Sequence, residues 1–174
     1  MRITKWPSKR APPLFGWDGR SSERVMPSPR LTQRLALIGA GQMAEALIGG
    51  FLDSGLLHPD QIRATDPSPE RRDHVQKRFG IRVAGGNSDV ASWADVVILA
   101  VKPQILPVVL DEISSVVEGK LVISVAAGTA LERIAARLPS NVRLVRAMPN
   151  APALLREGMT ALAMGEGVTD HDAR

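Results

Sequence analysis

From residue 35 onward, short runs of apolar residues alternate with longer stretches in which apolar residues recur every three or four positions. Short runs bounded by turn residues are typical of buried strands, and the longer spacing is typical of helices with one buried face. The run from Asp95 to Val101 is the clearest strand, because it is apolar on both faces, as in the centre of a parallel sheet. We predict strands at residues 35–38, 61–65, 81–84, 95–101, 121–125, 142–147 and 159–163.

The stretches between these strands predict helices, several of which have recognisable starts. Ser68-Pro69-Glu70 has the order of an N-cap, a first-turn proline and a first-turn acid. Asn87 or Ser88 is expected to cap a short helix, and Thr129-Ala130-Leu131-Glu132 has the pattern of a capping box. We predict helices at residues 42–52, 69–79, 88–93, 103–117 and 129–138.

Strands and helices therefore alternate, and this order requires crossover connections between parallel strands. We predict an α/β fold of the Rossmann type, with a doubly wound, mostly parallel sheet and helices on both faces. This domain is assigned to residues 35–165. Residues 1–34 are predicted to be a disordered, basic, proline-rich extension. Residues 166–174, with Asp170 as a candidate helix cap, are predicted to begin a truncated C-terminal helical domain.

Charge is distributed unevenly along the chain. Residues 1–34 hold eight Lys and Arg but two acidic residues, whereas the remaining residues hold 14 basic and 16 acidic ones. The basic character belongs to the extension, and no later basic run is interleaved with aromatic residues, so we expect no nucleic-acid partner. No apolar run reaches the roughly 18–20 residues of a membrane span. We therefore expect a cytoplasmic protein that does not cross a membrane.

Composition narrows the possible chemistry. The chain has no cysteine, which excludes disulfides, cysteine-ligated zinc, iron–sulfur clusters and thiol nucleophiles. His58, His74 and His171 show no ligand spacing, so we expect no metal site. No Ser/His/Asp arrangement or carboxylate pair stands out either, and no catalytic side chain is assigned. This fits a reductase, because its cofactor supplies the reacting atoms.

The first predicted strand ends in a glycine-rich turn, Gly39-Ala40-Gly41-Gln42-Met43-Ala44, which fits the pattern G-x-G-x-x-G/A. Gly39 would permit the tight turn, Gly41 would let a pyrophosphate approach the backbone, and Ala44 is small enough for close packing of helix on strand. The phosphates would lie at the helix N-terminus, where unpaired N–H groups favour an anion. The sequence therefore predicts binding of a nicotinamide dinucleotide.

The residue that follows the second predicted strand bears on which dinucleotide binds. Asp66 lies 25 residues beyond Gly41, where an acid accepts hydrogen bonds from the ribose hydroxyls of NAD. Arg71 and Arg72 could instead meet the 2′-phosphate of NADP. Equally, Asp66 and the prolines after it could form a simple turn and helix cap. NADP(H) and NAD(H) both remain open at this point.

Three further segments follow strands at the same edge of the predicted sheet, where ligands bind in open parallel sheets. Lys102 and Pro103 follow the clearest strand, although Lys102 could equally be an ordinary solvated loop residue. The small residues 124–129 would let backbone groups approach a ligand. Met148-Pro149-Asn150-Ala151-Pro152 is expected to form a loop that its two prolines make rigid, and in it Asn150 offers both a donor and an acceptor.

Four motifs in this order resemble pyrroline-5-carboxylate reductase. They are Ile38 to Leu47 (IGAGQMAEAL), Ala100 to Gln104 (AVKPQ), Ser124 to Gly128 (SVAAG) and Arg146 to Ala153 (RAMPNAPA). The resemblance covers residues 35 to about 165. It implies hydride transfer from NAD(P)H to the C=N carbon of 1-pyrroline-5-carboxylate, which gives L-proline in the last step of proline synthesis.

The resemblance also implies roles for individual residues. The phosphates would contact Ile38, Gly39, Ala40, Gly41, Gln42 and Met43. The adenosine and nicotinamide riboses would contact Asn87, Ala100, Val101, Lys102 and Pro103. The nicotinamide would face Val125, Ala126 and Ala127, and the reaction centre would border Met148, Pro149 and Asn150.

The chain departs from the family in two ways. Ala151 replaces the threonine of the usual Met-Pro-Asn-Thr-Pro loop, from which we expect a small effect. The C-terminal helical domain, which in the family builds a homo-oligomer and most of the substrate pocket, is expected to be missing. Without that C-terminal domain, the dinucleotide-binding domain should bind NADPH weakly and reduce little substrate. Two alternatives are a non-catalytic NAD(P)-binding module and another NAD(P)-dependent imine or hydroxyacid dehydrogenase.

Overall fold

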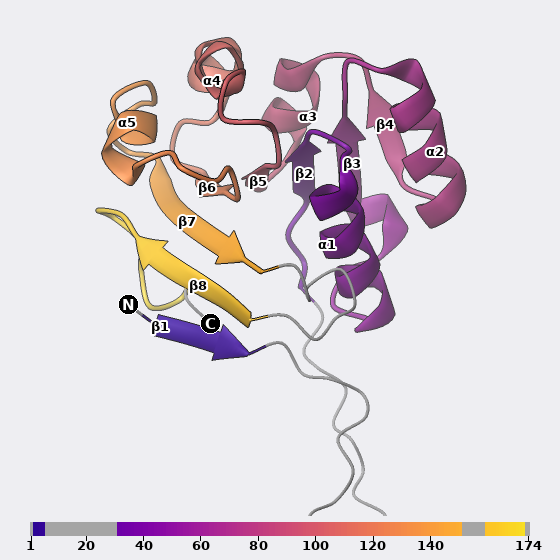
Figure 1. Cartoon of the computed structure of the whole chain (residues 1–174), viewed down its shortest axis with the longest axis horizontal. Coiled ribbons are helices and arrows are strands. Elements are labelled where there is room, and N and C mark those ends of the chain that lie inside the picture. Colours follow the sequence, from indigo (N-terminus) through magenta and orange to yellow (C-terminus); the bar gives the residue numbers. More distant parts are fainter. Residues whose placement is uncertain (1, 6–30, 151–158, 173–174) are drawn as a thin grey trace, which may run out of the picture.

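The computed structural model describes residues 2–5, 31–150 and 159–172. Its strands form one eight-stranded sheet of order β1-β8-β7-β6-β5-β2-β3-β4 (Figure 1). The strands are β1 (Arg2–Lys5), β2 (Leu35–Ile38), β3 (Ile62–Thr65), β4 (Arg82–Ala84), β5 (Val96–Leu99), β6 (Leu121–Ser124), β7 (Arg143–Pro149) and β8 (Met159–Met164). The helices are α1 (Gln42–Asp53), α2 (Pro69–Phe79), α3 (Asn87–Trp93), α4 (Leu106–Ile113) and α5 (Leu131–Ala135), with short 3₁₀ turns η1 (Pro59–Gln61) and η2 (Ser114–Val116).

The six strands from β2 to β7 are parallel, while β8 runs antiparallel to β7 and β1 antiparallel to β8. Ile38 lies opposite both Thr65 and Leu99, and Leu99 lies opposite Ser124. The carboxyl ends of β2, β3, β5 and β6 are therefore level with one another. The predicted fold class, a mostly parallel Rossmann-type sheet, is confirmed.

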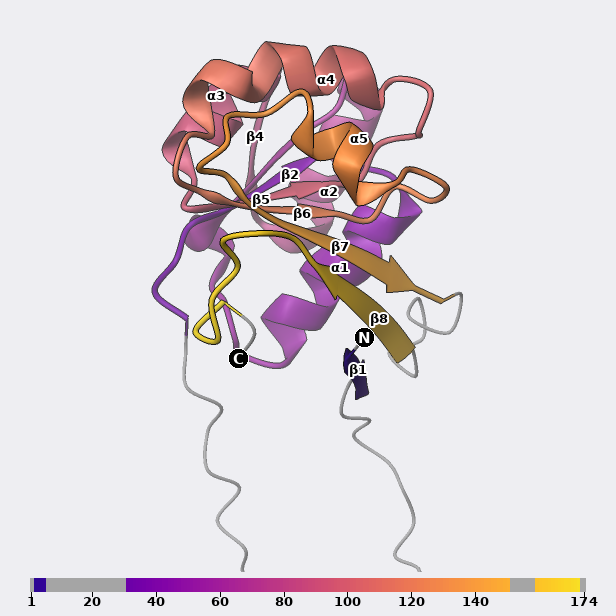
Figure 2. The same ribbon diagram turned by 90° about the vertical axis from the view of Figure 1, so that its left-hand side faces the viewer.

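Helices cover both faces of this sheet, with α1 on one side and α3 and α4 on the other (Figure 2). Successive strand residues point to opposite faces, so Leu37 joins the core under α1 and α2, whereas Ile38 joins the core under α3, α4 and α5. The fully buried residues of both cores are aliphatic, and the partly buried rings of Trp93, Phe51 and Phe79 pack against them. Full burial of such a side chain stabilises a fold by about 1.5–3 kcal/mol. None of the helices that the structure describes is long and apolar enough to cross a membrane.

The start and end of α2 agree with the sequence. Ser68 caps the helix, since its hydroxyl accepts a hydrogen bond from the backbone N–H of Arg71 at 3.2 Å. Pro69 opens the first turn, where its missing N–H costs nothing. Gly80 ends the helix in the left-handed conformation, at φ 68°.

Other predicted caps are wrong. The expected capping box at Thr129 is not formed, because α5 begins one residue later, with Ala130 as N-cap and no cap from a described side chain. At α3 the N-cap is Gly86. The Asn87 amide instead donates to Glu112 of α4 at 2.5 Å, and the Ser88 hydroxyl donates to the Glu112 carbonyl at 2.7 Å. Both polar side chains join two helices rather than capping one.

Two more boundaries differ. Residues 103–105 were expected to be helical but form a turn, in which the N–H of Ile105 donates to the carbonyl of Lys102 at 3.1 Å. Near the C-terminus, residues 170–172 form a turn, and the side-chain hydrogen bonds of this turn come from Thr169 and Asp172 and not from Asp170. The Thr169 hydroxyl accepts from the N–H of Asp172 at 3.3 Å, and the Asp172 carboxylate accepts from the N–H of Thr169 at 2.9 Å. Asp172 also pairs with Arg143 of β7.

Parts of residues 1–34 have structure that the sequence did not indicate. Arg2–Lys5 forms β1 and pairs with β8. Further along, Arg34 forms an ion pair with Asp95 at 2.9 Å, and its guanidinium lies 5.6 Å from the centre of the Trp93 ring. Arg63 approaches the same ring at 4.1 Å. The folded unit therefore includes residues immediately before β2.

Candidate functional site

Three of the predicted segments meet at the carboxyl edge of the sheet, because strand-like hydrogen bonds continue beyond the strand ends. The N–H of Ala100 donates to the carbonyl of Ile38 at 2.8 Å, and the N–H of Val125 donates to the carbonyl of Leu99 at 3.1 Å. These bonds place residues 38–43, 100–103 and 125–127 side by side. The edge is the place where open parallel sheets bind ligands.

The two glycines of the turn have different reasons to be glycine. Gly39 has φ 97°, and a Cβ atom there would lie 2.5 Å from the carbonyl oxygen of Ala100. The protein itself therefore requires glycine at this position. Gly41 has φ −76°, and a Cβ atom there would meet no described atom within 4 Å. None of the residues that the structure describes fills the space next to Gly41, which is where a pyrophosphate would approach.

Gly41 is also the N-cap of α1, and none of the described side chains caps this helix. The first N–H groups of an α-helix have no partner within the helix, and together with the helix dipole they favour an anion. The residues present thus fit a dinucleotide phosphate, with open space and uncapped amides at one point.

Asp66 and Arg71 both hold the residue between these glycines. The Asp66 carboxylate accepts from the N–H of Ala40 at 2.9 Å, and the Arg71 Nε donates to the carbonyl of Ala40 at 3.0 Å. The other Asp66 oxygen accepts from the N–H of Ser68 at 3.0 Å. Asp66 is therefore part of a local turn, as one interpretation of the sequence expected, and it also lies against the glycine turn.

Glu45, in the first turn of α1, is a residue that the sequence reasoning missed. Its carboxylate pairs with three basic side chains of α2: Arg71, His74 at 3.2 Å and Arg78 at 2.7 Å. Burial alone would raise the pKa of Glu45, but hydrogen bonds from Arg71 and His74 hold that pKa below its ordinary value. The partners lie 26 to 33 residues away, so no local motif could have indicated them.

Some of the residues predicted to contact the riboses and the nicotinamide are exposed to solvent, and others are buried. Lys102 and Pro103 are exposed, Ala126 is buried and Ala127 is exposed. The hydroxyl of buried Ser124 accepts from the N–H of Ala126 at 3.3 Å, which fixes the turn after β6. Asn87 lies on α3, where its amide nitrogen donates one of its two hydrogens to Glu112.

The predicted reaction-side residues lie at the end of β7. The side chain of Met148 is 54% exposed, and its sulfur lies 3.3 Å from Nη2 of Arg146. The Nε of Arg146 is buried and has no hydrogen-bond partner among the described residues, a feature the sequence did not indicate. The Asn150 side-chain oxygen accepts from the N–H of Met159 at 2.9 Å, which joins β7 to β8. Ala151 lies outside the described residues.

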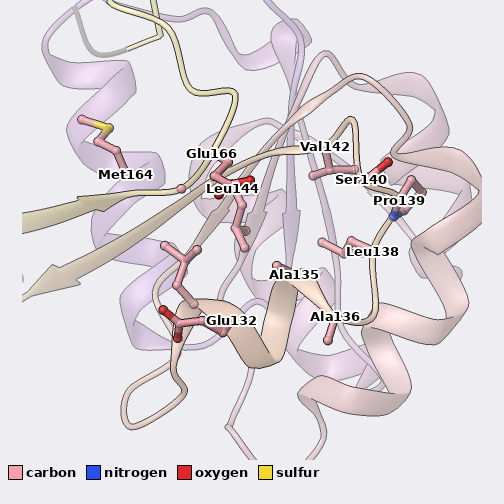
Figure 3. Close-up of a pocket in the computed structure, with 12 residues that line it drawn as sticks. Glu132, Ala135, Ala136, Leu138, Pro139, Ser140, Val142, Leu144, Met164 and Glu166 are labelled. Atoms are coloured by element: carbon pink, nitrogen blue, oxygen red, sulfur yellow. The ribbon is translucent and has the colours of Figure 1, made fainter.

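A cavity of about 550 Å³ lies elsewhere, between α5 and the β7–β8 strands (Figure 3). Its lining is largely apolar and includes Leu131, Ala135, Leu138 and Leu144. None of the residues predicted for the functional site lines it. This apolar cavity is therefore separate from the glycine turn.

Sequence comparisons agree with the geometry. The family model described as NADP oxidoreductase, coenzyme F420-dependent, matches residues 34–128. Pyrroline-5-carboxylate reductase of Escherichia coli (strain K12) is 40% identical over 143 residues, which cover 82% of this chain and 53% of that protein. The Glycine max reductase is 36% identical over 149 residues, with 85% and 54% covered. The chain spans about half the length of the curated relatives it matches.

Solved structures give the same result. The pyrroline-5-carboxylate reductase of Coxiella burnetii superposes with a TM-score of 0.79 at 34% identity, covering 82% of this chain and 53% of that one. Plasmodium falciparum pyrroline carboxylate reductase, solved with NADP bound, gives 0.74 at 26% identity, covering 83% and 52%. The chain therefore belongs to the family described as NADP oxidoreductase, coenzyme F420-dependent, and corresponds to the N-terminal half of pyrroline-5-carboxylate reductases.

Proposed function

We propose that the chain binds NADP(H), with NAD(H) as a second cofactor, and forms the cofactor half of an enzyme that reduces 1-pyrroline-5-carboxylate to L-proline. The observation that carries this proposal is the open space at Gly41, next to the uncapped start of α1. Relatives that are 35–42% identical bear the reductase name, and one solved relative holds NADP.

Each segment has a defined task in this proposal. The amides after Gly41 hold the pyrophosphate, and Asp66 accepts from the adenosine ribose. Residues 100–103 and 125–127 line the ribose and nicotinamide, while Met148 to Asn150 border the reacting carbon. The bound cofactor supplies a hydride for the C=N carbon, and the imine nitrogen holds a proton. The protein aligns the two partners and excludes water between them.

The binding part is tested on the 174-residue chain by titration calorimetry with NADPH and NADH. Saturable binding is expected, and a folded chain that binds neither cofactor would remove the proposal. The catalytic part is tested on a chain extended to the full length of its relatives, as pyrroline-5-carboxylate-dependent oxidation of NADPH. The proposal also assigns a domain to residues 35–165, a cytoplasmic location and a homo-oligomeric complete protein. Fractionation and light scattering measure the last two.

A non-catalytic NAD(P)-binding module is the second candidate, because the features that support cofactor binding, the open space at Gly41 and the uncapped start of α1, do not by themselves require turnover. This candidate shares the binding result with the first but predicts no turnover by the extended chain. The two assays together therefore separate the candidates.

A further inference from the structure

The cluster formed by Glu45 and its three basic partners lies where the adenosine end of a bound dinucleotide would be recognised. Arg71 touches the carbonyl of Ala40, and Asp66, the candidate ribose acceptor, touches the N–H of the same residue. Gln42, Glu45, Arg71, His74 and Arg78 also line one cleft of about 720 Å³ between α1 and α2. Arg71, one of the two arginines that could meet a 2′-phosphate, is therefore already bound to an acid of the protein.

The donors of Arg71 can be followed one by one. Its Nε donates to the Ala40 carbonyl, and its Nη2 donates both to that carbonyl and to Glu45. Its Nη1 has no hydrogen-bond partner among the residues that the structure describes. A guanidinium binds a phosphate best through two parallel N–H donors, either Nη1 with Nη2 or Nε with Nη2. Both pairs include Nη2, and both hydrogens of Nη2 are engaged.

Resting on the proposed function, we infer that Glu45 tunes the choice between NADPH and NADH by competing with the 2′-phosphate for the guanidinium of Arg71. NADPH must displace Glu45 from Nη2 before Arg71 can bind the 2′-phosphate through Nη1 and Nη2. NADH carries no 2′-phosphate and leaves the pair intact. Glu45 thereby lowers the affinity for NADPH relative to NADH, although it does not contact the nicotinamide or the substrate.

The other charged groups of the cluster support this direction. His74 and Arg78 also bond to Glu45, and their side chains are about half exposed. Removal of the Glu45 charge leaves all three basic groups without that acid and increases the positive potential around Arg71. Arg72, by contrast, donates to the carbonyls of Asp66 and Pro67 at 2.6 and 3.2 Å, so Glu45 does not hold it.

The test uses the 174-residue chain and measures dissociation constants for NADPH and NADH, with 2′,5′-ADP and 5′-ADP as probes of the adenosine end alone. In Glu45→Ala, NADPH and 2′,5′-ADP should bind about fivefold to tenfold more tightly, whereas NADH and 5′-ADP change by less than about twofold. Glu45→Gln keeps the side-chain size and should shift the ratio in the same direction. Asp111→Ala, which frees Arg137 from a similar ion pair on another part of the surface, should leave the ratio unchanged.

A double-mutant comparison identifies the competing group. In an Arg71→Gln background, Glu45→Ala should no longer change the NADPH to NADH ratio, because the guanidinium is absent. An unchanged ratio in Glu45→Ala, an equal shift for both cofactors, or a shift that persists in Arg71→Gln would overturn the inference while the proposed function stands. A folded wild-type chain that binds neither cofactor would instead reject the proposed function itself.

Discussion

Helices α1 and α2 lie side by side and both follow a parallel strand, but they begin in opposite ways. Ser68 caps α2 with its hydroxyl, and Pro69 occupies the first turn. At the start of α1 stands Gly41, with no cap from any side chain in the described part of the chain. A good N-cap stabilises a helix by roughly 1 kcal/mol. The absence of this stabilisation at α1 leaves its amides accessible to a ligand.

The starts of the two helices show which residues stabilise the fold and which leave room for a ligand. The start of α2 is closed by its own sequence, so its polar groups are satisfied without a partner. The turn before α1 contains one glycine that the fold needs, Gly39, and one that it does not, Gly41. Substitutions at these positions should therefore affect different measurements.

The largest effect is expected for Gly39→Ala. The new Cβ would meet the Ala100 oxygen at 2.5 Å, in a backbone conformation at φ 97° that favours glycine. We expect the free energy of unfolding to fall by roughly 3 kcal/mol, which denaturant titration followed by circular dichroism would measure. Gly55→Ala is a matched control, because its φ of 68° is also positive but no described atom lies within 4 Å of its added Cβ. An equal loss in both variants would contradict the role of the Ala100 contact.

Gly41→Ala should have the opposite pattern of effects, with little change in stability and a large loss of NADPH affinity. Its Cβ meets no described atom within 4 Å and its φ is −76°, so the unfolding free energy should change by less than about 0.5 kcal/mol. The Cβ would occupy the space left for the pyrophosphate, and NADPH should bind at least about tenfold more weakly, or about 1.4 kcal/mol. Calorimetry and thermal unfolding of the same sample test both halves. Unchanged NADPH affinity would mean that the space at Gly41 is not used.

Ser68→Ala removes the cap of α2. The N–H of Arg71 loses its acceptor, and we expect the unfolding free energy without ligand to fall by about 1 kcal/mol. Ser92→Ala serves as control, because the Ser92 hydroxyl donates to a carbonyl within α3 and caps no helix start. Similar unfolding curves for Ser68→Ala and the wild type would show that the cap contributes nothing measurable.

The smallest effect concerns pH. The folded pKa of Glu45 is below its ordinary value of 4.5, so the stability it contributes is present above about pH 4.5 and is lost as the pH falls through the folded pKa. At neutral pH, Glu45→Gln should be less stable than wild type by up to about 1 kcal/mol, and the difference should disappear on acidification. Unfolding curves over this pH range test the sign. A difference that grows in acid would contradict it.

Features determined by neighbouring residues could be predicted from the sequence. Apolar periodicity located the strands of the parallel sheet, and the order Ser68-Pro69-Glu70 located the start of α2, because cap and helix are contiguous. The turn from Gly39 to Ala44 was assigned for the same reason. Its strand, glycines and helix form one continuous segment.

Features determined by distant partners could not be predicted. Asn87 was expected to cap α3, but Glu112 on α4 offers its amide a charged acceptor, and the two helices pack together. Glu45 was not singled out at all, because its partners reach it only when α1 and α2 lie side by side. Sequence motifs describe the site along the chain but do not describe its electrostatics.

Trp93, whose ring centre lies 4.1 Å from the guanidinium of Arg63 and 5.6 Å from that of Arg34, offers an optical probe of the domain. This indole lies on α3 in the folded unit, whereas Trp6 and Trp17 belong to residues that the structure leaves undescribed. With those two replaced by phenylalanine, emission from Trp93 would report on one place in the domain. A bound reduced nicotinamide absorbs in the range where indole emits. Quenching of the Trp93 emission would therefore measure the fraction of protein that holds the cofactor.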